Sequence, residues 1–495
     1  MDKNKLLLGI DFGTSTNFVT KYDFKKRDAV AIQNMGNYGG DNIFDNVIYI
    51  ENDSNNIIGS VKQRLSDPEN FFEDIKRFIV DDSWKKRVPN LNNREVSAQD
   101  IAEMIFGSIK NKVEMIENRA IDGVVITVPY SYGKKYSQRI KESAENVGLK
   151  VIQLVEEPVA AAISYGLFGD DIQNNKKEKI AVFDLGGGTF DITIFNFEKS
   201  DNQHAKIEVL NTDGVEKLGG RNIDELLSNK FRNILKIENS DFAKEKERQK
   251  FQTDLNSISK KTKEILSCES EDDIYEVITI NGINHELEKN FDVEELNSIL
   301  KNNNFLGKVE DALWRAVNDI DLQPSDIDRI VLAGGTSTIP VIRKIVEDFF
   351  GKKAEAKKSL GELVGHGAGI LAGLSEDDSL QYTIVRKTSK NIGIAQGNRF
   401  KHILSKNFKY GEASAKKPIK LKNRKSELII TFYEGDSAEI ESCEKIGHIL
   451  IDGTLFKDEN IYISLIKEDK SDSQIRCYIY DNNSNIVIDD YLVDD

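Results

Sequence analysis

The segment GIDFGTSTNFV, residues 9–19, places one carboxylate and a run of small hydroxyl residues between two apolar stretches. Either a plain hairpin turn or a phosphate-binding loop would give this pattern. It recurs in IAVFDLGGGTFDITIFNFE, residues 180–198, where a strand ends in Asp184, glycines make the turn and Asp191 begins a second strand. The two copies predict an internal duplication, with each copy forming half of a cleft.

A third glycine turn lies in RIVLAGGTSTIPVIRKIVEDFFG, residues 329–351, where a strand again runs into two glycines. Glycine lets backbone N–H groups approach a ligand closely, and successive N–H groups form a site for anions. The hydroxyl groups of Thr14, Ser15 and Thr189 can donate further hydrogen bonds to phosphate oxygens. One such turn alone would favour a simple tight turn, but three together favour phosphate binding.

Three carboxylates accompany the first two turns: Asp11, Asp184 and Asp191. Carboxylates repel phosphate unless a cation lies between them. A hydrated Mg²⁺ ion keeps most of its waters and is held by one or two carboxylates together with phosphates. The sequence therefore predicts a Mg²⁺–nucleotide site.

Bulk composition narrows the class of protein. The chain has 495 residues, 39% hydrophobic and 31% charged, and its formal net charge of −15 argues against nucleic acid or an anionic membrane surface as the main partner. The three cysteines are far apart, which favours a reducing compartment over a disulfide framework or a zinc site. There is no apolar run of about 18 residues and no signal peptide, so we expect a cytoplasmic protein with no membrane partner.

The pattern of elements divides the chain in two. Strands and helices alternate as far as residue 376, which is typical of an α/β fold. Polar and charged residues then predict a linker over residues 377–390. From 391 to 495 the apolar pattern is that of strands, with a hairpin turn expected at DNNSN, residues 481–485. We therefore expect a nucleotide-binding domain over residues 1–376, a linker, and a β-sandwich domain that binds a substrate or partner.

The glycine turns belong to a longer series of motifs. In order, these are GIDFGTSTNFV, DIKRFI (74–79), VVITVPYSY (124–132), EEPVAAAISYG (156–166), VFDLGGGTFD (182–191), KLGGRNID (217–224) and VLAGGTSTIP (331–340). With these motifs the chain resembles the seventy-kilodalton heat-shock chaperones of the DnaK type, within the actin, sugar-kinase and heat-shock ATPase superfold. The resemblance implies an actin-like ATPase domain of two duplicated lobes, ATP or ADP with Mg²⁺ as cofactors, and a β region similar to the family's peptide-binding β-subdomain.

The resemblance also implies roles for individual residues. Lys76 points at the γ-phosphate, Glu157 and Asp184 position water or Mg²⁺, Thr189 lies beside the γ-phosphate, and Asp191 lies near the attacking water. Asp11 and Asp184 hold Mg²⁺ through water. The residues expected to bind the nucleotide are Gly13, Thr14, Ser15, Thr16, Gly186, Gly187, Gly188, Thr189, Gly219, Gly220, Lys263, Gly334, Gly335 and Thr336. On the residues alone, Lys76 could be a surface lysine, Glu157 a loop carboxylate and Asp191 the cap of a strand turn.

The nucleoside side departs from the family pattern. Glu264 and Thr338 stand where the family stacks adenine between two arginines, and Gly361 replaces an aspartate near the base and ribose. Lys263 remains. An arginine–adenine stack contributes roughly 0.5–2 kcal/mol. We therefore expect weaker and less selective binding of ATP, unless drift at these positions has no effect on function.

Two further departures concern communication between domains. A family arginine on the helix after Pro129 aligns with Ser137, and the linker aspartate aligns with Arg386, so the usual pair cannot form. The helical lid that follows the β-subdomain in the family has no counterpart in the sequence. These features predict weak coupling between the domains, unless Arg386 meets a carboxylate such as Glu142 in a rebuilt latch.

Three functions remain open at this point. The first is an ATP-dependent chaperone that hydrolyses ATP slowly and binds unfolded or extended peptides, with a co-chaperone or nucleotide-exchange factor as a possible partner. The second is a nucleotide-dependent regulatory protein with a dedicated protein partner and little or no turnover. The third, a small-molecule kinase of the same superfold, leaves the β region without a role.

Overall fold

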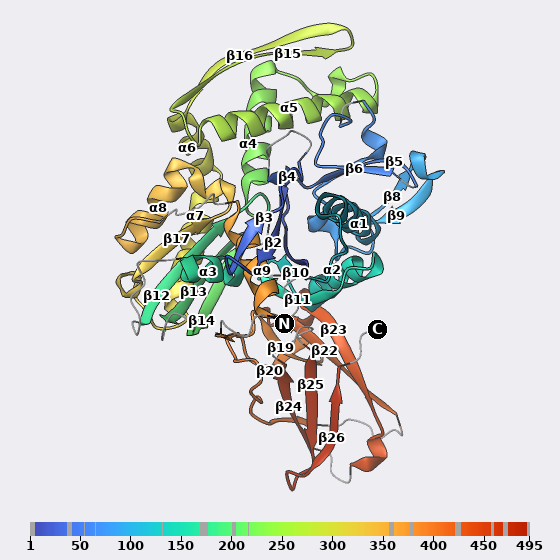
Figure 1. Ribbon diagram of the computed structural model, residues 1–495, viewed down its shortest axis with the longest axis vertical. Helices are drawn as coiled ribbons and strands as arrows, with labels where there is room; N and C mark the ends of the chain where they lie inside the picture. The colour runs from blue at the N-terminus through green and yellow to red at the C-terminus, as the bar shows by residue number, and fades with distance from the viewer. Residues whose placement is uncertain are drawn as a thin grey trace.

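The computed structural model places two lobes side by side and a β domain beneath them (Figure 1). It describes residues 5–36, 42–53, 55–64, 66–130, 132–168, 177–199, 204–215, 217–355, 361–376, 381–420, 427–456, 460–468 and 474–492. The first four residues of the predicted linker therefore lie outside the described residues. No helix in the described ranges is long and apolar enough to cross a membrane.

The first lobe is built on a sheet with strand order β11-β10-β1-β2-β3, in which β4 also pairs with β2. Its strands are β1 (Leu7–Phe12), β2 (Thr16–Asp23), β3 (Asp28–Ala31), β4 (Ile43–Asp45), β10 (Gly123–Val128) and β11 (Val151–Glu156). The lobe's helices are α1 (Ala98–Glu117), α2 (Lys134–Asn146) and α3 (Glu157–Phe168). Smaller sheets extend it: β5 (Val47–Asn52), β6 (Asn55–Ile58) and β7 (Phe71–Glu73) form one, and β8 (Lys85–Val88) and β9 (Arg94–Ser97) form another.

The second lobe has a sheet with strand order β17-β12-β13-β14-β18. Its strands are β12 (Lys177–Leu185), β13 (Phe190–Lys199), β14 (His204–Val215), β17 (Arg329–Ala333) and β18 (Gln381–Val385). The helices that follow β14 are α4 (Gly220–Leu235), α5 (Glu245–Ile265), α6 (Val293–Asn302), α7 (Phe305–Asn318), α8 (Pro340–Phe350) and α9 (Leu363–Leu374). A hairpin of β15 (Glu271–Ile280) and β16 (Ile283–Asp292) extends beside α5 (Figure 1).

The predicted duplication is present in the topology of the two sheets. In the first lobe, β1 pairs antiparallel with β2 and parallel with β10. In the second lobe, β12 pairs antiparallel with β13 and parallel with β17. Each pair of equivalent strands, β1–β2 and β12–β13, is joined by one of the glycine turns. The repeat in the sequence therefore corresponds to a repeat of one structural unit.

Helices α3 and α9 pack against each other between the two sheets. A Cβ atom at Gly367 of α9 would lie 1.8 Å from the carbonyl oxygen of Ala160 in α3, so only glycine permits this approach. Their apolar cluster includes Val159 and Ala368 together with Val182 and Phe195 of the second sheet. The many small residues of segment 361–374 therefore allow α9 to pack closely on its neighbours.

The β domain consists of two four-stranded sheets with orders β20-β19-β22-β23 and β21-β24-β25-β26. The strands are β19 (Asn391–Gln396), β20 (Arg399–Leu404), β21 (Lys417–Lys420), β22 (Leu428–Gly435), β23 (Glu444–Ile451), β24 (Asn460–Lys467), β25 (Ile475–Tyr480) and β26 (Ile486–Tyr491). Phe432, Ile461 and Leu465 are among the buried residues between the sheets. The expected hairpin turn at residues 481–485 joins β25 to β26.

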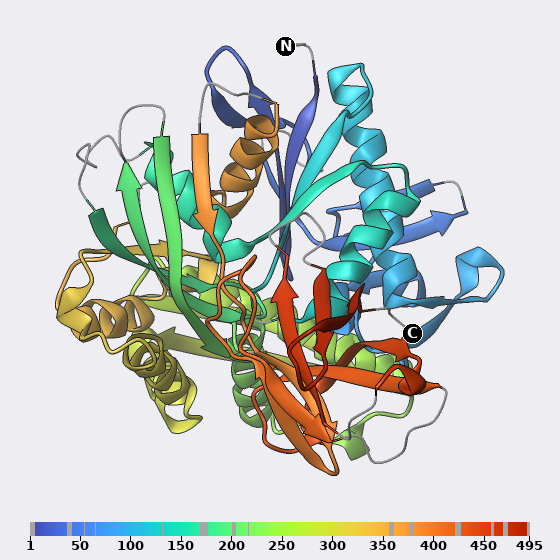
Figure 2. The ribbon, with the colours of Figure 1, turned by 90° about the horizontal axis from the view of Figure 1, so that it is seen from below.

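The segment interpreted as a linker contributes a strand to the second lobe. Residues 381–385 form β18, which pairs parallel with β14, and Figure 2 shows the two strands side by side. The next residue, Arg386, has its Nε atom 3.6 Å from Oε2 of Glu156 at the end of β11. The β domain also reaches the second lobe directly, since Nζ of Lys406 lies 3.5 Å from Oδ2 of Asp213 in β14. The β domain is therefore in contact with both lobes.

Candidate functional site

The glycine turns of the two lobes meet around a cavity of about 90 Å³. Most residues predicted to bind nucleotide or metal line it: Asp11, Gly13, Thr14, Ser15, Thr16, Lys76, Glu157, Asp184, Gly186, Gly187, Thr189, Gly334 and Gly335. Gly361 and Val364 at the start of α9 complete the wall. Segments that are distant in the sequence thus form one site between the lobes.

The first two glycine turns face each other closely. A Cβ atom at Gly187 would lie 2.1 Å from Oγ of Ser15, so a larger residue would force the two turns apart. Thr14 and Thr189 are both buried, with 6% of each residue exposed. Residues of both turns therefore line the same small volume, as a site for anions built from two turns requires.

Lys76 and Glu157 form a buried ion pair at the cavity. The 3₁₀ helix of residues Ile75–Phe78 carries Lys76, and Glu157 is the first residue of α3. Nζ of Lys76 donates to Oε1 of Glu157 at 2.5 Å, and the two residues are 2% and 8% exposed. The interpretation of Lys76 as a surface lysine is therefore wrong. The pair fixes the ammonium group within the cavity wall.

The carboxylates of Asp11 and Asp184 are held in a site that disfavours their negative charge. Burial, and then the charge of Glu157, raise the pKa of Asp11 to about 7, although the hydroxyl of Thr127 donates to its Oδ1 at 2.8 Å. Burial, followed by Glu157 and Asp191, raises the pKa of Asp184 well above its ordinary value. The site holds more negative charge than Lys76 balances, and a divalent cation fits such a donor set.

No three His, Cys, Asp or Glu side chains in the described part of the chain are close enough together to hold a metal ion directly. A Mg²⁺ ion at Asp11 and Asp184 would therefore bind with water in most of its coordination positions, which is the usual behaviour of this ion. Asp11 and Asp184 would hold it, and its charge would offset their mutual repulsion.

The remaining predicted residues form a second layer behind the cavity wall. Asp191 lies directly opposite Asp184 in the β12–β13 register and is 2% exposed. Gly188 lies against Thr14, and Gly219 lies against the backbone of the Gly187 turn. None of these residues lines the cavity.

Lys263, Gly220 and Thr336 also stand in this second layer. Nζ of Lys263 lies 2.6 Å from Oδ1 of Asp224 and donates to the carbonyl of Gly220 at 3.2 Å. The hydroxyl of Thr336 donates to the carbonyl of Gly186 at 2.8 Å. Burial lowers the pKa of Lys263, while Asp224 opposes that shift. Lys263 therefore supports the glycine turn of the second lobe indirectly, through its contact with Gly220.

Sequence reasoning missed two polar residues of the site. Thr127 supports Asp11 from the end of β10, and Asp224 holds Lys263 from α4. Both occur within quoted motifs, VVITVPYSY and KLGGRNID, so the motifs carried a signal. Their partners, however, are 116 positions away for Thr127 and 39 positions away for Asp224 along the printed sequence, and only the folded chain brings them together.

Glu264 and Thr338, which replace the two family arginines, are both exposed. The side chain of Glu264 is 61% exposed and lies 4.0 Å from Nζ of Lys260. Lys260 also reaches Oδ1 of Asp45 in the first lobe at 3.2 Å. Thr338 is exposed and donates to the carbonyl of Gly335. Neither Glu264 nor Thr338 lines the cavity.

Comparison with known proteins agrees with this geometry. The family model described as Hsp70 protein matches residues 7–459. The chaperone protein DnaK of Thermotoga petrophila is 28% identical over 445 residues, which cover 88% of this chain and 71% of that protein. Chaperone protein dnaK1 of a Nostoc species is 29% identical over 428 residues, covering 81% of this chain and 59% of that protein. Because the family model spans nearly the whole chain, this protein belongs to the Hsp70 family.

Proposed function

We propose that this protein is a chaperone of the DnaK type that binds ATP and ADP with Mg²⁺, hydrolyses ATP slowly, and holds extended peptides or a protein partner in its β domain. The observation that supports the ATPase part is the convergence of three glycine turns, from both lobes, around Lys76, Glu157 and Asp184. Phosphoryl transfer to water depends mainly on positioning and charge stabilisation, which such a site supplies.

Each group in the cavity has a proposed task. The backbone N–H groups of the Gly13 and Gly187 turns bind phosphate oxygens, and Thr14 and Thr189 add hydroxyl donors. Lys76 supplies positive charge where the transferred phosphate develops negative charge. Mg²⁺, when bound at Asp11 and Asp184, neutralises further phosphate charge.

Two carboxylates are proposed to position the attacking water. Glu157 lines the cavity and keeps one oxygen engaged with Lys76, so its other oxygen can accept a hydrogen bond from water. Asp191 stands behind Asp184, and we assign it a positioning role. Slow hydrolysis is proposed because of the chain's membership of the Hsp70 family.

Peptide binding is proposed for the outer surface of the β20-β19-β22-β23 sheet. Ile429 and Leu450 are register partners on β22 and β23, and they are 62% and 56% exposed. In the described residues β23 is an edge strand, so an extended peptide can add main-chain hydrogen bonds along it. The neighbouring apolar side chains would then contact alternate residues of the peptide.

The second candidate is a nucleotide-dependent regulatory protein with little or no turnover. One observation favours it: Glu264 and Thr338 lie outside the cavity wall, so the nucleoside gains few contacts. A protein that binds nucleotide loosely can still respond to it, but sustained turnover would then be weak.

Single-turnover ATP hydrolysis by the full chain, with Mg²⁺ and with or without an unfolded peptide, tests these functions. A chaperone hydrolyses ATP slowly and responds to the peptide. A regulatory protein binds Mg²⁺–ATP without hydrolysing it. Transfer of phosphate to a small hydroxyl acceptor would indicate a kinase, and no binding of Mg²⁺–ATP would contradict all three.

A further inference from the structure

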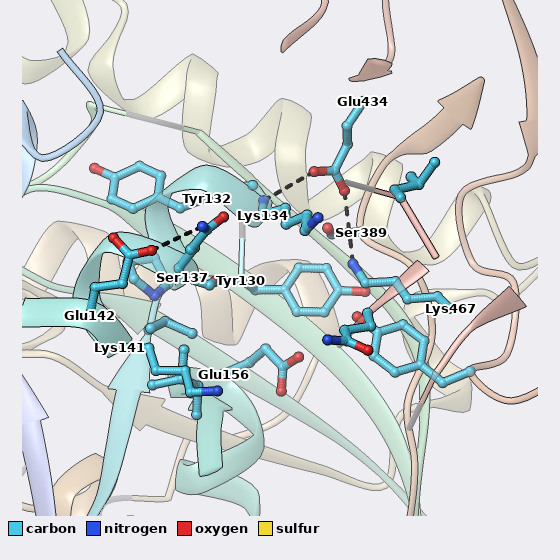
Figure 3. A pocket seen from close by; sticks show the side chains of 18 of the residues that line it. Tyr130, Tyr132, Lys134, Ser137, Lys141, Glu142, Glu156, Ser389, Glu434 and Lys467 are labelled. Atoms are coloured by element: carbon cyan, nitrogen blue, oxygen red, sulfur yellow. Dashed lines mark hydrogen bonds and ion pairs between the residues drawn. The ribbon is translucent and has the colours of Figure 1, made fainter. Parts of the chain in front are cut away.

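A second and larger cavity, of about 300 Å³, lies where the first lobe, the linker and the β domain meet. Its wall combines one face of α2 with the end of β10, the end of β11, Ser389 of the linker segment, and Tyr410, Glu434, Lys467, Gln474 and Leu492 of the β domain. Figure 3 shows the side chain of Tyr130 lying across the middle of this space. This volume is at the lower end of the range for small-molecule sites.

The part of the cavity wall nearest the core is apolar and aromatic. Val128, Pro129 and Leu154 contribute aliphatic surface from the first lobe, and Tyr130 and Tyr410 contribute rings from the two sides of the junction. Tyr130 is 6% exposed and donates its hydroxyl to the carbonyl of Lys387 at 3.2 Å. The rings are therefore fixed in place, and their faces attract positive charge.

The residues that line the wall carry more carboxylates than ammonium groups, and the guanidinium of Arg386 lies beside the wall. Four carboxylates line the cavity, Glu142, Glu145, Glu156 and Glu434, against three ammonium groups, Lys134, Lys141 and Lys467.

Two of the three ammonium groups are already engaged. Nζ of Lys467 lies 3.9 Å from Oε1 of Glu434 and 5.1 Å from the ring centre of Tyr410. Nζ of Lys134 donates to the carbonyl of Ile446 at 3.3 Å. The third, Lys141, stands one helical turn before Glu145, at the spacing of a helical ion pair.

Glu156 is the carboxylate best placed to accept a new donor. Its Oε2 atom is buried and has no hydrogen-bond partner among the described residues. Arg386 lies 3.6 Å from it, which is within ion-pair range but longer than a hydrogen bond. Burial, and then Tyr410 and Glu156, raise the pKa of the Tyr130 hydroxyl, so it stays protonated beside Glu156.

We propose that this junction cavity binds a small organic cation, an alkylammonium or guanidinium compound with an apolar body. Its charged end pairs with Glu156, and its apolar body lies over Tyr130 and Leu154. Because the two domains and the linker share the wall, the complete site exists only when the β domain is docked. By linkage, a bound cation stabilises the docked arrangement.

Titration calorimetry of the full chain with three probes of similar shape tests the charge requirement. The three probes are benzylamine, which is a cation, benzyl alcohol, which is neutral, and benzoate, which is an anion. Agmatine is added as a separate guanidinium probe. We expect saturable binding of one benzylamine per chain. The affinities for benzyl alcohol and benzoate should be lower by about tenfold or more, because neither can donate a charge-assisted hydrogen bond to Glu156. Equal binding of benzoate, or no saturable binding of either cation, would overturn the proposal.

Two variants test the location. Glu156→Gln removes the negative charge with little change of side-chain volume. It should lower the affinity for benzylamine by about tenfold. Ser137→Trp fills the cavity from α2 and should abolish binding; should it fail to fold, Ser389→Phe fills the cavity from the linker side. The matched control is Glu310→Gln, since Glu310 is an exposed carboxylate on α7 that is absent from the cavity wall. Unchanged affinity in Glu156→Gln and in the filled variant would place the cation elsewhere and refute the assignment.

Discussion

Asp11 is a carboxylate that the folded chain holds at an unfavourable site. Its pKa is about 7 in the folded protein, compared with an ordinary value of 3.8. The folded state therefore keeps a proton between these values that the unfolded state has released, and stability falls as pH rises from about 4 to about 7. Such a loss of stability is expected at a site whose carboxylates are stabilised only when a cation binds.

The first prediction concerns Asp11→Asn in the absence of nucleotide and Mg²⁺. The amide keeps an acceptor for Thr127 but cannot ionise, so the variant should be more stable than the native chain at pH 8, by on the order of 1–4 kcal/mol. The difference should disappear toward pH 4. Urea unfolding at several pH values measures it.

Asp23→Asn is the control for Asp11→Asn. Backbone hydrogen bonding from Lys26 lowers the pKa of Asp23, so the sign is reversed: that variant loses stability above pH 4. A stabilisation by Asp11→Asn that does not change with pH would show that burial of charge at Asp11 is not its cause.

The second prediction concerns the buried pair of Lys76 and Glu157. Lys76→Ala should abolish ATP hydrolysis and keep nucleotide binding, because the glycine turns still bind the phosphates. It also leaves Glu157 buried without a cation, which costs about 3–5 kcal/mol of stability. Single-turnover hydrolysis and nucleotide titration measure the two effects.

The double variant Lys76→Ala/Glu157→Gln separates chemistry from folding. It removes the unpaired charge, so stability should recover while hydrolysis stays absent. Hydrolysis at the native rate in Lys76→Ala would mean that this ammonium group does not act on the phosphate.

The residues of the site divide into those that sequence alone could predict and those it could not. Gly13, Gly187 and Thr189 were predictable because the geometry they require is local to one turn. Thr127 and Asp224 were not, because each acts on a residue of another element. Lys76 is an intermediate case. The motif DIKRFI predicted its role, but its burial depends on contact with α3, where Glu157 pairs with it.

At the scale of elements, the period of the apolar residues indicates the helices of the first lobe and its strands β1, β2, β10 and β11, but not the short strands β3 to β9. Apolar residues recur at helical spacing over residues 98–119 and 134–148, and the structure forms α1 over Ala98–Glu117 and α2 over Lys134–Asn146. The β15–β16 hairpin was not predicted. In β15, Ile274 and Ile278 are buried while Tyr275 and Val277 are exposed, so apolar residues lie on both faces and no simple alternation of apolar and polar residues marks the strand.

The third prediction belongs to α5 and the turn before α8, which border the nucleoside side of the cleft. Glu264→Arg/Thr338→Arg should tighten ATP binding by about 1–3 kcal/mol and raise the preference for ATP over GTP. Both positions are exposed, so the longer side chains can be accommodated. Titration calorimetry with both nucleotides provides the measurement.

Lys261→Arg is the matched control for the base clamp. Lys261 is on the same helix and faces Glu276 of β15, away from the glycine turns, so an arginine there should leave affinity unchanged. Tight, adenine-selective binding by the native chain would contradict the idea that the clamp is missing.

At the scale of the whole molecule, the β domain is in contact with both lobes of the ATPase domain. The backbone N–H of Lys134 in the first lobe donates to Glu434 of the β domain at 3.3 Å. On the other side, Lys406 is paired with Asp213 of the second lobe. A relative rotation of the lobes must therefore change at least one of these contacts, so docking of the β domain and the shape of the cleft cannot vary independently.

The sequence predicted weak coupling between the two domains unless Arg386 pairs with a carboxylate. In the structure, Arg386 lies beside Glu156. The side chains are only 11% and 18% exposed, so removing one partner costs more than it does in an ion pair on an open surface. Glu142, the carboxylate first considered, accepts hydrogen bonds from Gln138 and Gln99. The linker segment is therefore held both by β18 pairing and by a charged contact at its end.

The fourth prediction tests whether this contact carries the coupling. Arg386→Asp places two carboxylates together and should weaken docking by about 1–3 kcal/mol, or roughly 5- to 150-fold. Peptide or partner affinity should then become nearly the same with ATP and with ADP. The charge-exchanged variant Arg386→Glu/Glu156→Arg restores an opposite pair and should recover part of the nucleotide effect. If the native chain shows a nucleotide effect that survives Arg386→Asp, the coupling runs through the Lys134 and Lys406 contacts, and the Arg386–Glu156 pair serves only to hold the linker.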